Sequence, residues 1–545
     1  MRKNTYLISI FCIALSIIQF TNHSDTVYAS VREPYPVTME YTENVGEDYV
    51  IVFKDRNLET AIREQIGKPE GNIFKSDVCN ITSLYLYDDQ ISDITPLSNF
   101  SALTVLNLSS NKIKDISPLS NLTNLTKLFL EYNQISDITP LSNLSKLVDL
   151  SLALNIITDL APLNNLSNLS SLDLCYTRTD ITPIANLKNL TCLNLSLNDL
   201  SDITVLKNLT NLTTLNLSHN EISDLSPIVN LSNLTRLEMT YNQISDLTPL
   251  YKLNNIDTLI LNYNKISDLA PLSNLVNMTR LDLSSNQISD ISSLGNLNNL
   301  TKLDLSHNKI IIISPISSLS NLNWISFHDN QINDISPLIN LSNINTIHLS
   351  YNKITDISPL RNLSSINFLN LGSNKISDLT PLSNLCNLYQ LDLCDTQMSD
   401  LTPIKDLINL RLLYLCNNQI KDISPLRNLK NLVDLFLDNN PLYDSSTQNA
   451  VRRKDLDFTV RGTIYEVWTL ESYLGDVNGD KKITSLDFAY MRKYLLSQIY
   501  EFPLGEKGLS AADVDGNNSF NSIDFAHVRN FLLGKGTIPP EKKAD

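Results

Sequence analysis

A 22-residue repeat constrains the fold of this chain more than any other feature of its 545 residues. The pattern LxxLxLxxN places an Asn, or a residue in its stead, at position 89 and then at regular intervals up to 440, seventeen times in all. Every interval is 22 residues except the one that follows Thr177, which is 21. Units this short cannot bury their apolar sides alone, so they must stack. The repeat therefore predicts one elongated solenoid, where length alone would suggest three or four globular domains.

Two apolar periods divide each repeat into a strand and a return. Leu106 and Leu108 alternate with polar neighbours, which is the period of two expected for a strand. From Ile113 to Leu122 the apolar residues recur at every third position, which favours a tight 3₁₀-like turn. The sequence thus predicts an α/β solenoid with a parallel concave β-sheet and 3₁₀-like returns on the convex side.

Three polar or rigid columns fit this geometry. Asn fills fourteen of the seventeen register positions, where its amide can bond to the backbone of adjacent turns. Pro fills fourteen of the sixteen sites seven residues later, where its fixed φ stiffens the return. Asp recurs between them, as at Asp115 and Asp356. We expect these carboxylates to bond the turn backbone rather than to form a ladder of calcium sites.

The pattern resembles the 22-residue leucine-rich repeat of bacterial internalin-like proteins. The resemblance implies a curved solenoid with a small helical cap at its start, for which Glu59 to Ile66 form the candidate helix. The expected organisation is a signal peptide at 1–29, an N-terminal segment and helical cap at 30–78, leucine-rich repeats at 79–445, a C-terminal cap or linker at 446–472 and a further domain at 473–545.

The concave face carries a group of aromatic side chains. Strand residues six, four and two positions before each register residue point away from the core. Leucine-rich repeats usually bind proteins through this face, and aromatic residues are enriched in binding hot spots. We predict a ligand site there, and the alternative is a set of incidental exposed aromatics on a drifting repeat. The predicted site comprises Trp324, His328, His348, Tyr351 and Phe368, and a weaker cluster comprises Tyr85, Tyr87, Phe129 and Tyr132.

Charged residues and cysteines on the same face have structural interpretations. Arg236 with Glu238, like similar pairs on later strands, forms a mixed-charge row that we expect on a solvated surface. Cys394 and Cys416 occupy equivalent positions on adjacent strands, within disulfide distance. Parallel neighbours aim these side chains alike, however, so free thiols are favoured over a bridge.

Catalysis is not expected. The sequence contains no GxSxG, HExxH, P-loop or Cys–His arrangement. A shallow curved sheet also offers no dry pocket. His328 and His348, with Asp329 nearby, leave metal binding or acid–base chemistry as the alternative.

The sharpest chemical pattern follows Leu474. A loop that reads DVNGDKKITSLD from Asp476 returns 37 residues later, from Asp513, as DVDGNNSFNSID. Oxygen donors at loop positions 1, 3, 5, 9 and 12, with the carbonyl at position 7, suit the six to eight oxygen ligands that calcium takes. Each loop leads into an amphipathic helix, at 488–496 and 525–533, and no comparable helix precedes either loop.

A duplicated loop and helix without an entering helix resembles a type I dockerin, the module that binds scaffoldin cohesins of the cellulosome, over residues 473–535. Lys481 replaces the Gly expected at loop position 6 and would weaken the first site. The residues at loop positions 10 and 11, Ser-Leu and Ser-Ile, mix the preferences of different cohesin groups, so the species of cohesin stays open. The resemblance implies two calcium ions, held by Asp476, Asn478, Asp480, the carbonyl of Lys482, Thr484 and Asp487, and by Asp513, Asp515, Asn517, the carbonyl of Ser519, Asn521 and Asp524. It also implies cohesin contacts at Ser485, Leu486, Arg492, Lys493, Ser522, Ile523 and Arg529.

The N-terminus predicts export. Arg2 and Lys3 precede an apolar stretch from Tyr6 to Phe20, and Ala29 ends a small-residue exit. The alternative is an N-terminal membrane anchor, although no second segment is long enough to span a bilayer. A net charge of −16 disfavours nucleic acid and anionic membranes as partners. We expect a secreted, extracellular protein associated with the cellulosome.

Together these features predict a non-catalytic secreted binding protein. Its dockerin would anchor it, through calcium, to a scaffoldin cohesin, and its concave face would recognise a protein or a polysaccharide. Two alternatives stay open. One is an enzyme or enzyme inhibitor that the dockerin delivers to polysaccharide degradation, and the other is an inert spacer.

Overall fold

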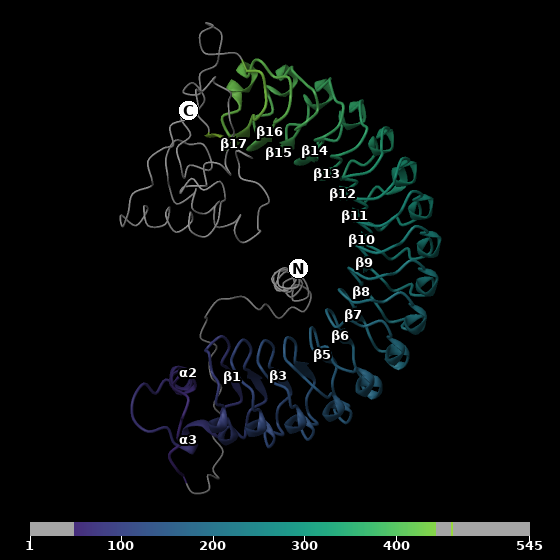
Figure 1. Ribbon diagram of the computed structural model, residues 1–545. Coiled ribbons are helices and arrows are strands. Elements are labelled where there is room, and N and C mark those ends of the chain that lie inside the picture. The colour runs from purple at the N-terminus through teal and green to yellow at the C-terminus, as the bar shows by residue number, and fades with distance from the viewer. Residues whose placement is uncertain (1–47, 443–458, 462–545) are drawn as a thin grey trace, which may run out of the picture.

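Repeated three-residue strands build the molecule. A computed structural model describes residues 48–442 and 459–461, and it forms the curved solenoid of Figure 1. Each strand pairs in parallel with the next one along the chain, so that Leu281 lies between Leu259 and Leu303. The strands are β1 (Ser83–Tyr85), β2 (Val105–Asn107), β3 (Lys127–Phe129), β4 (Asp149–Ser151), β5 (Ser171–Asp173), β6 (Cys192–Asn194), β7 (Thr214–Asn216), β8 (Arg236–Glu238), β9 (Thr258–Ile260), β10 (Arg280–Asp282), β11 (Lys302–Asp304), β12 (Trp324–Ser326), β13 (Thr346–His348), β14 (Phe368–Asn370), β15 (Gln390–Asp392), β16 (Leu412–Tyr414), β17 (Asp434–Phe436) and β18 (Thr459–Arg461).

Short 3₁₀ helices close each repeat on the outer side of the arc, as the three-residue apolar period predicts. Pro usually occupies their first turn, where its missing N–H costs no bond. They are η2 (Thr95–Asn99), η3 (Ser117–Leu119), η4 (Thr139–Leu141), η5 (Ala161–Leu163), η6 (Thr182–Asn186), η7 (Thr204–Asn208), η8 (Ser226–Ile228), η9 (Thr248–Leu250), η10 (Ala270–Leu272), η11 (Ser292–Leu294), η12 (Ser314–Ser318), η13 (Ser336–Leu338), η14 (Ser358–Leu360), η15 (Thr380–Leu382), η16 (Thr402–Ile404) and η17 (Ser424–Asn428).

One apolar core runs the whole length of the arc between the sheet and the 3₁₀ helices. Its Leu and Ile columns are almost completely buried, and Phe100 and Phe327 fill larger places in the same core. Each repeat therefore buries its apolar residues against its neighbours.

The register Asn residues form a continuous hydrogen-bond ladder. Asn308 donates through Nδ2 to the carbonyl oxygens of Leu283, Leu305 and Ser306 at 3.0–3.1 Å. Its Oδ1 accepts from the backbone N–H of Ile288 at 2.9 Å. One side chain thus satisfies backbone groups of two successive repeats, which confirms the role expected for this column.

The Asp column caps the 3₁₀ helices. Oδ1 of Asp115 accepts from the backbone N–H of Ser117 at 2.8 Å, and Oδ1 of Asp356 accepts in the same way from Ser358. These side chains bond the turn backbone, as the sequence indicates.

A helical cap covers the first repeat. Helix α2 (Arg56–Ile66) begins three residues before the expected helix, because Asp55 caps it by accepting from the N–H groups of Asn57 and Leu58. Asp55 also accepts from the N–H of Ser92 at 2.7 Å, which fixes the cap to the repeats, and a short helix α3 (Lys75–Val78) follows.

At the other end, β18 extends the sheet. Thr459 pairs with Asp434 of β17 in the same parallel register as the repeats. These residues belong to the segment expected to be a cap or linker. The expected signal peptide and dockerin lie outside the described residues, as do the start of the N-terminal segment and the rest of 446–472.

Candidate ligand-binding face

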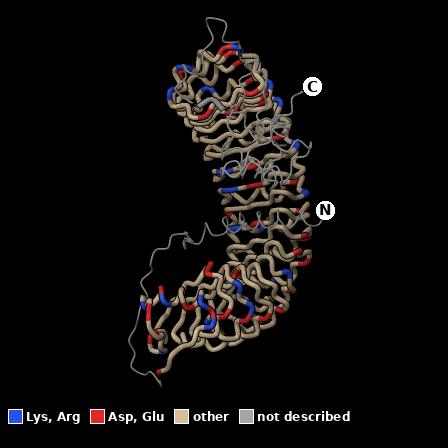
Figure 2. Tube along the Cα trace, turned by 60° about the vertical axis from the view of Figure 1, so that its left-hand side comes forward, with Lys and Arg blue, Asp and Glu red and all other residues tan. Residues whose placement is uncertain are grey.

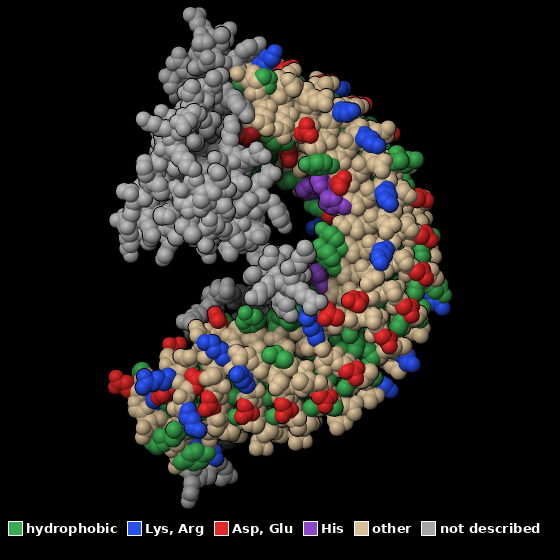
Figure 3. Space-filling view, viewed as in Figure 1, with side chains coloured by type: hydrophobic (Ala, Val, Ile, Leu, Met, Phe, Trp, Pro, Cys, Tyr) green, Lys and Arg blue, Asp and Glu red, His purple; other side chains and the backbone are tan. Residues whose placement is uncertain are grey.

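Three rings predicted from the register lie together on the concave face. Trp324 of β12, His348 of β13 and Phe368 of β14 form a chain, with ring centroids 5.4 Å apart for Trp324–His348 and 4.6 Å apart for His348–Phe368. Lys302 of β11 places Nζ 4.6 Å from the centroid of the Trp324 ring. Figure 3 shows histidine and apolar side chains on the inner side of the arc.

A second line of rings runs beside the first. His328 lies 4.8 Å from His307 and 5.2 Å from Tyr351, both in edge-to-face contact. The Nδ1 atoms of the two histidines are held by hydrogen bonds, from His307 to Asp329 Oδ2 at 2.9 Å and from His328 to Ser350 Oγ at 2.7 Å. We call Trp324, His328, His348, Tyr351 and Phe368 the aromatic patch.

Burial sets the charge of this patch. It lowers the pKa of His328 and His348, chiefly through desolvation, although Asp304 opposes the shift. Desolvation therefore favours the neutral imidazole at both positions. Burial also lowers the pKa of Lys302, with Arg280 adding to the shift.

The aromatic patch is an open surface across neighbouring strands. The rings are partly exposed, they span three strands, and Ser350 fixes the orientation of His328. Within residues 48–442, no group of three or more His, Cys, Asp or Glu side chains is arranged to hold a metal ion. Acidic and basic residues are interspersed along the arc (Figure 2).

The weaker aromatic cluster lies at the other end of the sheet. Tyr85 and Phe129 are on β1 and β3, and Tyr87 and Tyr132 follow these strands with more exposed side chains. Strands β4 to β11 therefore separate the cluster from the aromatic patch (Figure 1).

Sequence reasoning missed a stack of rings in the middle of the arc. Tyr241 and Tyr263 lie face to face with centroids 4.0 Å apart, and His219 stacks on Tyr241 at 4.7 Å. All three immediately precede a register Asn, the position also held by Tyr351. The residue before the register position has a positive φ in every repeat and is never Gly. The Asn ladder therefore holds non-glycine residues, Tyr and His among them, in an uncommon backbone conformation. Scanning this column would have found the stack.

The first mixed-charge pair is largely buried, contrary to expectation. Glu238 is buried, and it forms an ion pair with Arg236, whose side chain is only 13% exposed. Asp282 and Asp304 of the later rows are partly buried. Strands β7 and β9 lie about 4.8 Å away on either side of β8, so their side chains crowd the pair and limit its contact with water.

Three further carboxylates lie on or just after neighbouring strands: Asp149 on β4, Asp173 on β5 and Glu131 two residues after β3. Burial raises the pKa of Glu131, Asp149 and Asp173, that of Asp173 to about 7. The carboxylates also repel one another, because Glu131 and Asp149 both raise the pKa of Asp173.

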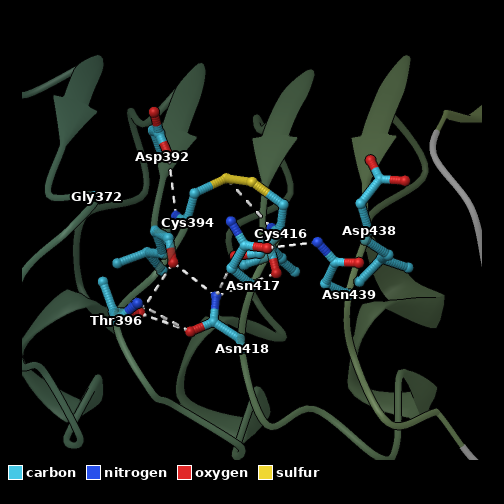
Figure 4. Close-up of a disulfide and its surroundings, with 12 residues drawn as sticks. Gly372, Asp392, Cys394, Thr396, Cys416, Asn417, Asn418, Asp438 and Asn439 are labelled. Atoms are coloured by element: carbon cyan, nitrogen blue, oxygen red, sulfur yellow. Dashed lines mark hydrogen bonds between the residues drawn. A yellow bond between two sulfur atoms is a disulfide. The ribbon is translucent and has the colours of Figure 1, made fainter. Parts of the chain in front are cut away.

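The cysteine prediction was wrong. Cys394 and Cys416 form a disulfide between the loops that follow β15 and β16, with their Cα atoms 4.6 Å apart (Figure 4). The strand ends come close enough for the two sulfur atoms to turn towards each other. Cys79, Cys175, Cys192 and Cys386 are free thiols.

Family comparisons decide what kind of chain this is. The type I dockerin domain family matches residues 474–533. Pairs of leucine-rich repeats match at 101–143, 188–230, 210–252, 254–296 and 408–449, and a single leucine-rich repeat matches at 299–322. The chain is an internalin-like leucine-rich repeat protein with a type I dockerin.

Solved structures with this fold include bacterial repeat proteins. An internalin, InlF, from Listeria monocytogenes is 31% identical, over 72% of this chain and 96% of that chain, with a TM-score of 0.40. A leucine-rich repeat protein of Leptospira interrogans is 25% identical, over 71% of this chain and 96% of that chain, with a TM-score of 0.57. The functional domain of InlJ from Listeria monocytogenes is 24% identical, over 72% and 82%, with a TM-score of 0.54, and supports the fold alone. No curated protein matches the chain.

The dockerin makes this internalin-like protein an interaction module of the cellulosome type. A type I dockerin implies a cohesin partner, calcium binding and association with an extracellular cellulosome. All predicted calcium ligands and cohesin contacts lie outside the described residues. Among the residues that are described, none belongs to a helix long and apolar enough to cross a membrane.

Proposed function

We propose that the protein is a non-catalytic secreted binding protein. Its dockerin attaches it to a scaffoldin cohesin, and its aromatic patch recognises a protein or a polysaccharide outside the cell. The observation that carries the second part is the chain of ring contacts from Trp324 through His348 to Phe368, which joins three successive strands.

The rigidity of the patch supports a recognition role. Aromatic rings have few rotatable bonds, so they lose little conformational entropy when a ligand orders them. His328 is further fixed by Ser350 and packs against Tyr351. A preorganised surface of this kind gains affinity because less free energy is spent on ordering it.

The composition of the dockerin loops supports the attachment. The donor set from Asp476 to Asp487 and from Asp513 to Asp524 consists of oxygen atoms, which suits a hard cation. These carboxylates repel one another until an ion joins them, so we expect two calcium ions to fold the module. Ser485, Leu486 and Arg492 would then contact the cohesin, with the equivalent residues of the second segment.

A binding screen tests the patch. The full chain is applied to arrays of plant and microbial polysaccharides and of cell-surface proteins, beside the variant Trp324→Ala/His348→Ala/Phe368→Ala. We expect the variant to lose about tenfold or more in affinity for the selected ligand, as is usual for a hot spot. A matched control is Tyr414→Ala/Phe436→Ala, which removes another stacked pair from the concave face.

Two results would contradict this function. Undiminished binding by the triple variant would remove the aromatic patch as the site. Hydrolysis of plant polymers by the purified protein would show that it is an enzyme instead.

A further inference from the structure

One turn of the solenoid lacks the carboxylate that all the others have. In sixteen successive turns the 3₁₀ helix is preceded by Asp fifteen times, and each of these side chains accepts a hydrogen bond from the N–H two residues later. The exception is Ile312. Its side chain has no oxygen, so this turn forgoes a stabilising cap.

The same turn exposes two isoleucines side by side. Ile311 also stands at a position that is polar in every other turn, and Ile311 and Ile312 are 51% and 66% exposed. Their neighbours Ile310 and Ile313 are buried and supply the core as in other repeats. The core therefore does not explain the outer pair. Two adjacent positions here carry apolar residues where the other turns have polar ones, and the loss of the Asp cap lowers stability. Such a departure is expected at a functional site.

Charge on both sides limits what can bind there. Asp290 precedes Ile312 in the column and Asp334 follows it, and both side chains are exposed at the start of their 3₁₀ helices. Figure 3 shows acidic side chains along the outer edge of the arc, with Lys and Arg side chains in a row beside them. The two exposed isoleucines thus lie between two negatively charged side chains.

We propose that Ile311 and Ile312 form a docking site on the flank of the solenoid for a protein segment that presents an apolar side chain between basic residues. The apolar side chain covers the two isoleucines, and the basic residues approach Asp290 and Asp334. A nucleic acid would be repelled by the carboxylates, and an isoleucine pair offers no hydrogen bonds to a sugar.

The site lies beside the aromatic patch without being part of it. His307 and Lys309 of the same turn are exposed, and His307 contacts His328 of the patch. The flank site does not depend on whether the concave face binds a ligand. Its test must therefore distinguish binding at the two isoleucines from binding at the aromatic patch.

A peptide selection provides this test. Random twelve-residue peptides are displayed and selected on the full chain, and each recovered peptide is measured against the variant Ile311→Ser/Ile312→Asp. We expect peptides with an apolar residue between Lys or Arg residues, and a loss of about tenfold or more in their affinity for the variant. The variant restores the residues of the other turns, so its melting temperature should not fall.

Three controls make the outcome specific. Ile156→Ser removes an isoleucine that is 67% exposed elsewhere in the arc, and it should leave binding unchanged. Asp290→Asn/Asp334→Asn keeps side chains that can cap the helices, and it should weaken binding and reduce its salt dependence. Peptides that depend on Trp324 and Phe368 instead report on the aromatic patch.

The proposal is overturned if no selected peptide depends on Ile311 and Ile312. It is also overturned if the dependent peptides lack basic residues, or if Ile156→Ser weakens their binding equally.

Discussion

At the scale of single residues, the register Asn holds the repeats in line. Asn308 satisfies three carbonyl groups and one N–H of the backbone. Where Thr396 replaces Asn, its Oγ1 keeps only one of the carbonyl bonds, to Leu393 at 2.9 Å. The N–H of Thr396 is then satisfied by the next Asn in the ladder, Asn418.

Removal of one such side chain should therefore lower stability. We expect Asn308→Ala to reduce the free energy of unfolding by about 1–3 kcal/mol, because buried backbone groups lose their partners. The measurement is urea denaturation followed by circular dichroism. Asn321→Ala is the matched control, since Asn321 donates a single exposed hydrogen bond to Asn298. Equal effects of the two substitutions would contradict a special role for the ladder.

Asp173 should make stability depend on pH. Burial and then Glu131 raise its folded pKa to about 7, well above the usual range of an Asp carboxyl, so the folded state binds this proton more tightly than the unfolded state. Its contribution is present below about pH 4 and is lost as pH rises through 7. We expect the free energy of unfolding of Asp173→Asn, relative to that of wild type, to rise by about 1–2 kcal/mol between pH 5 and pH 8. This is less than the full pKa shift would give, because the side chain is partly exposed.

Urea denaturation of both proteins at the two pH values gives the measurement. A difference between wild type and variant that stays constant with pH would show that Asp173 does not titrate in this range.

Register arithmetic predicts which residues share a face, but not how closely they approach. It placed Trp324, His348 and Phe368 on adjacent strands, and the structure brings their rings into contact. It could not give the burial of Glu238, because this depends on how tightly each side chain packs against the next strand. The binding role of the aromatic patch stays a prediction.

At the scale of the elements, a disulfide forms where the sequence favours free thiols. That prediction holds only if the side chains of parallel neighbours stay parallel. Cys394 and Cys416 lie beyond the ends of β15 and β16, where the chain already turns. Here the backbone, not the strand pleat, sets the direction of the sulfur atoms.

Reduction of this bridge should destabilise the C-terminal repeats. A loop of 22 residues corresponds to about 2–4 kcal/mol of lost stabilisation in the chain-entropy view. We expect Cys394→Ser/Cys416→Ser to lower the melting temperature and to abolish its response to dithiothreitol. A wild-type protein that melts at the same temperature with and without reductant would show that the bridge contributes nothing.

Strands and 3₁₀ helices themselves are predictable because each repeat carries the same local signals. Alternating leucines specify the strand, and Asp and Pro specify the turn that follows, as at Asp115 and Pro118. Helix α2 begins three residues before its predicted start because a single residue, Asp55, caps it by accepting from the N–H groups of Asn57 and Leu58. A cap occurs once per helix, so it leaves no periodic signal.

At the scale of the whole molecule, the chain combines a leucine-rich repeat arm with a dockerin. The arm is one continuous core, and it spreads the aromatic patch and the flank isoleucines over neighbouring repeats. The dockerin match begins at residue 474, beyond β18 at the end of the sheet. The sequence predicts both domains because each is internally repeated. The identity of the ligand cannot be predicted in this way, because no repeated pattern encodes it.

Capture by an immobilised type I cohesin tests the central claim most directly. The full chain is applied in calcium and again in excess chelator, together with the variant Asp476→Ala/Asp513→Ala, which removes the first ligand of each loop. We expect capture in calcium, and a loss of about a hundredfold or more in affinity with chelator or with the variant, because the ion folds the module. Capture that persists unchanged in chelator, or no capture by any type I cohesin in calcium, would contradict the account.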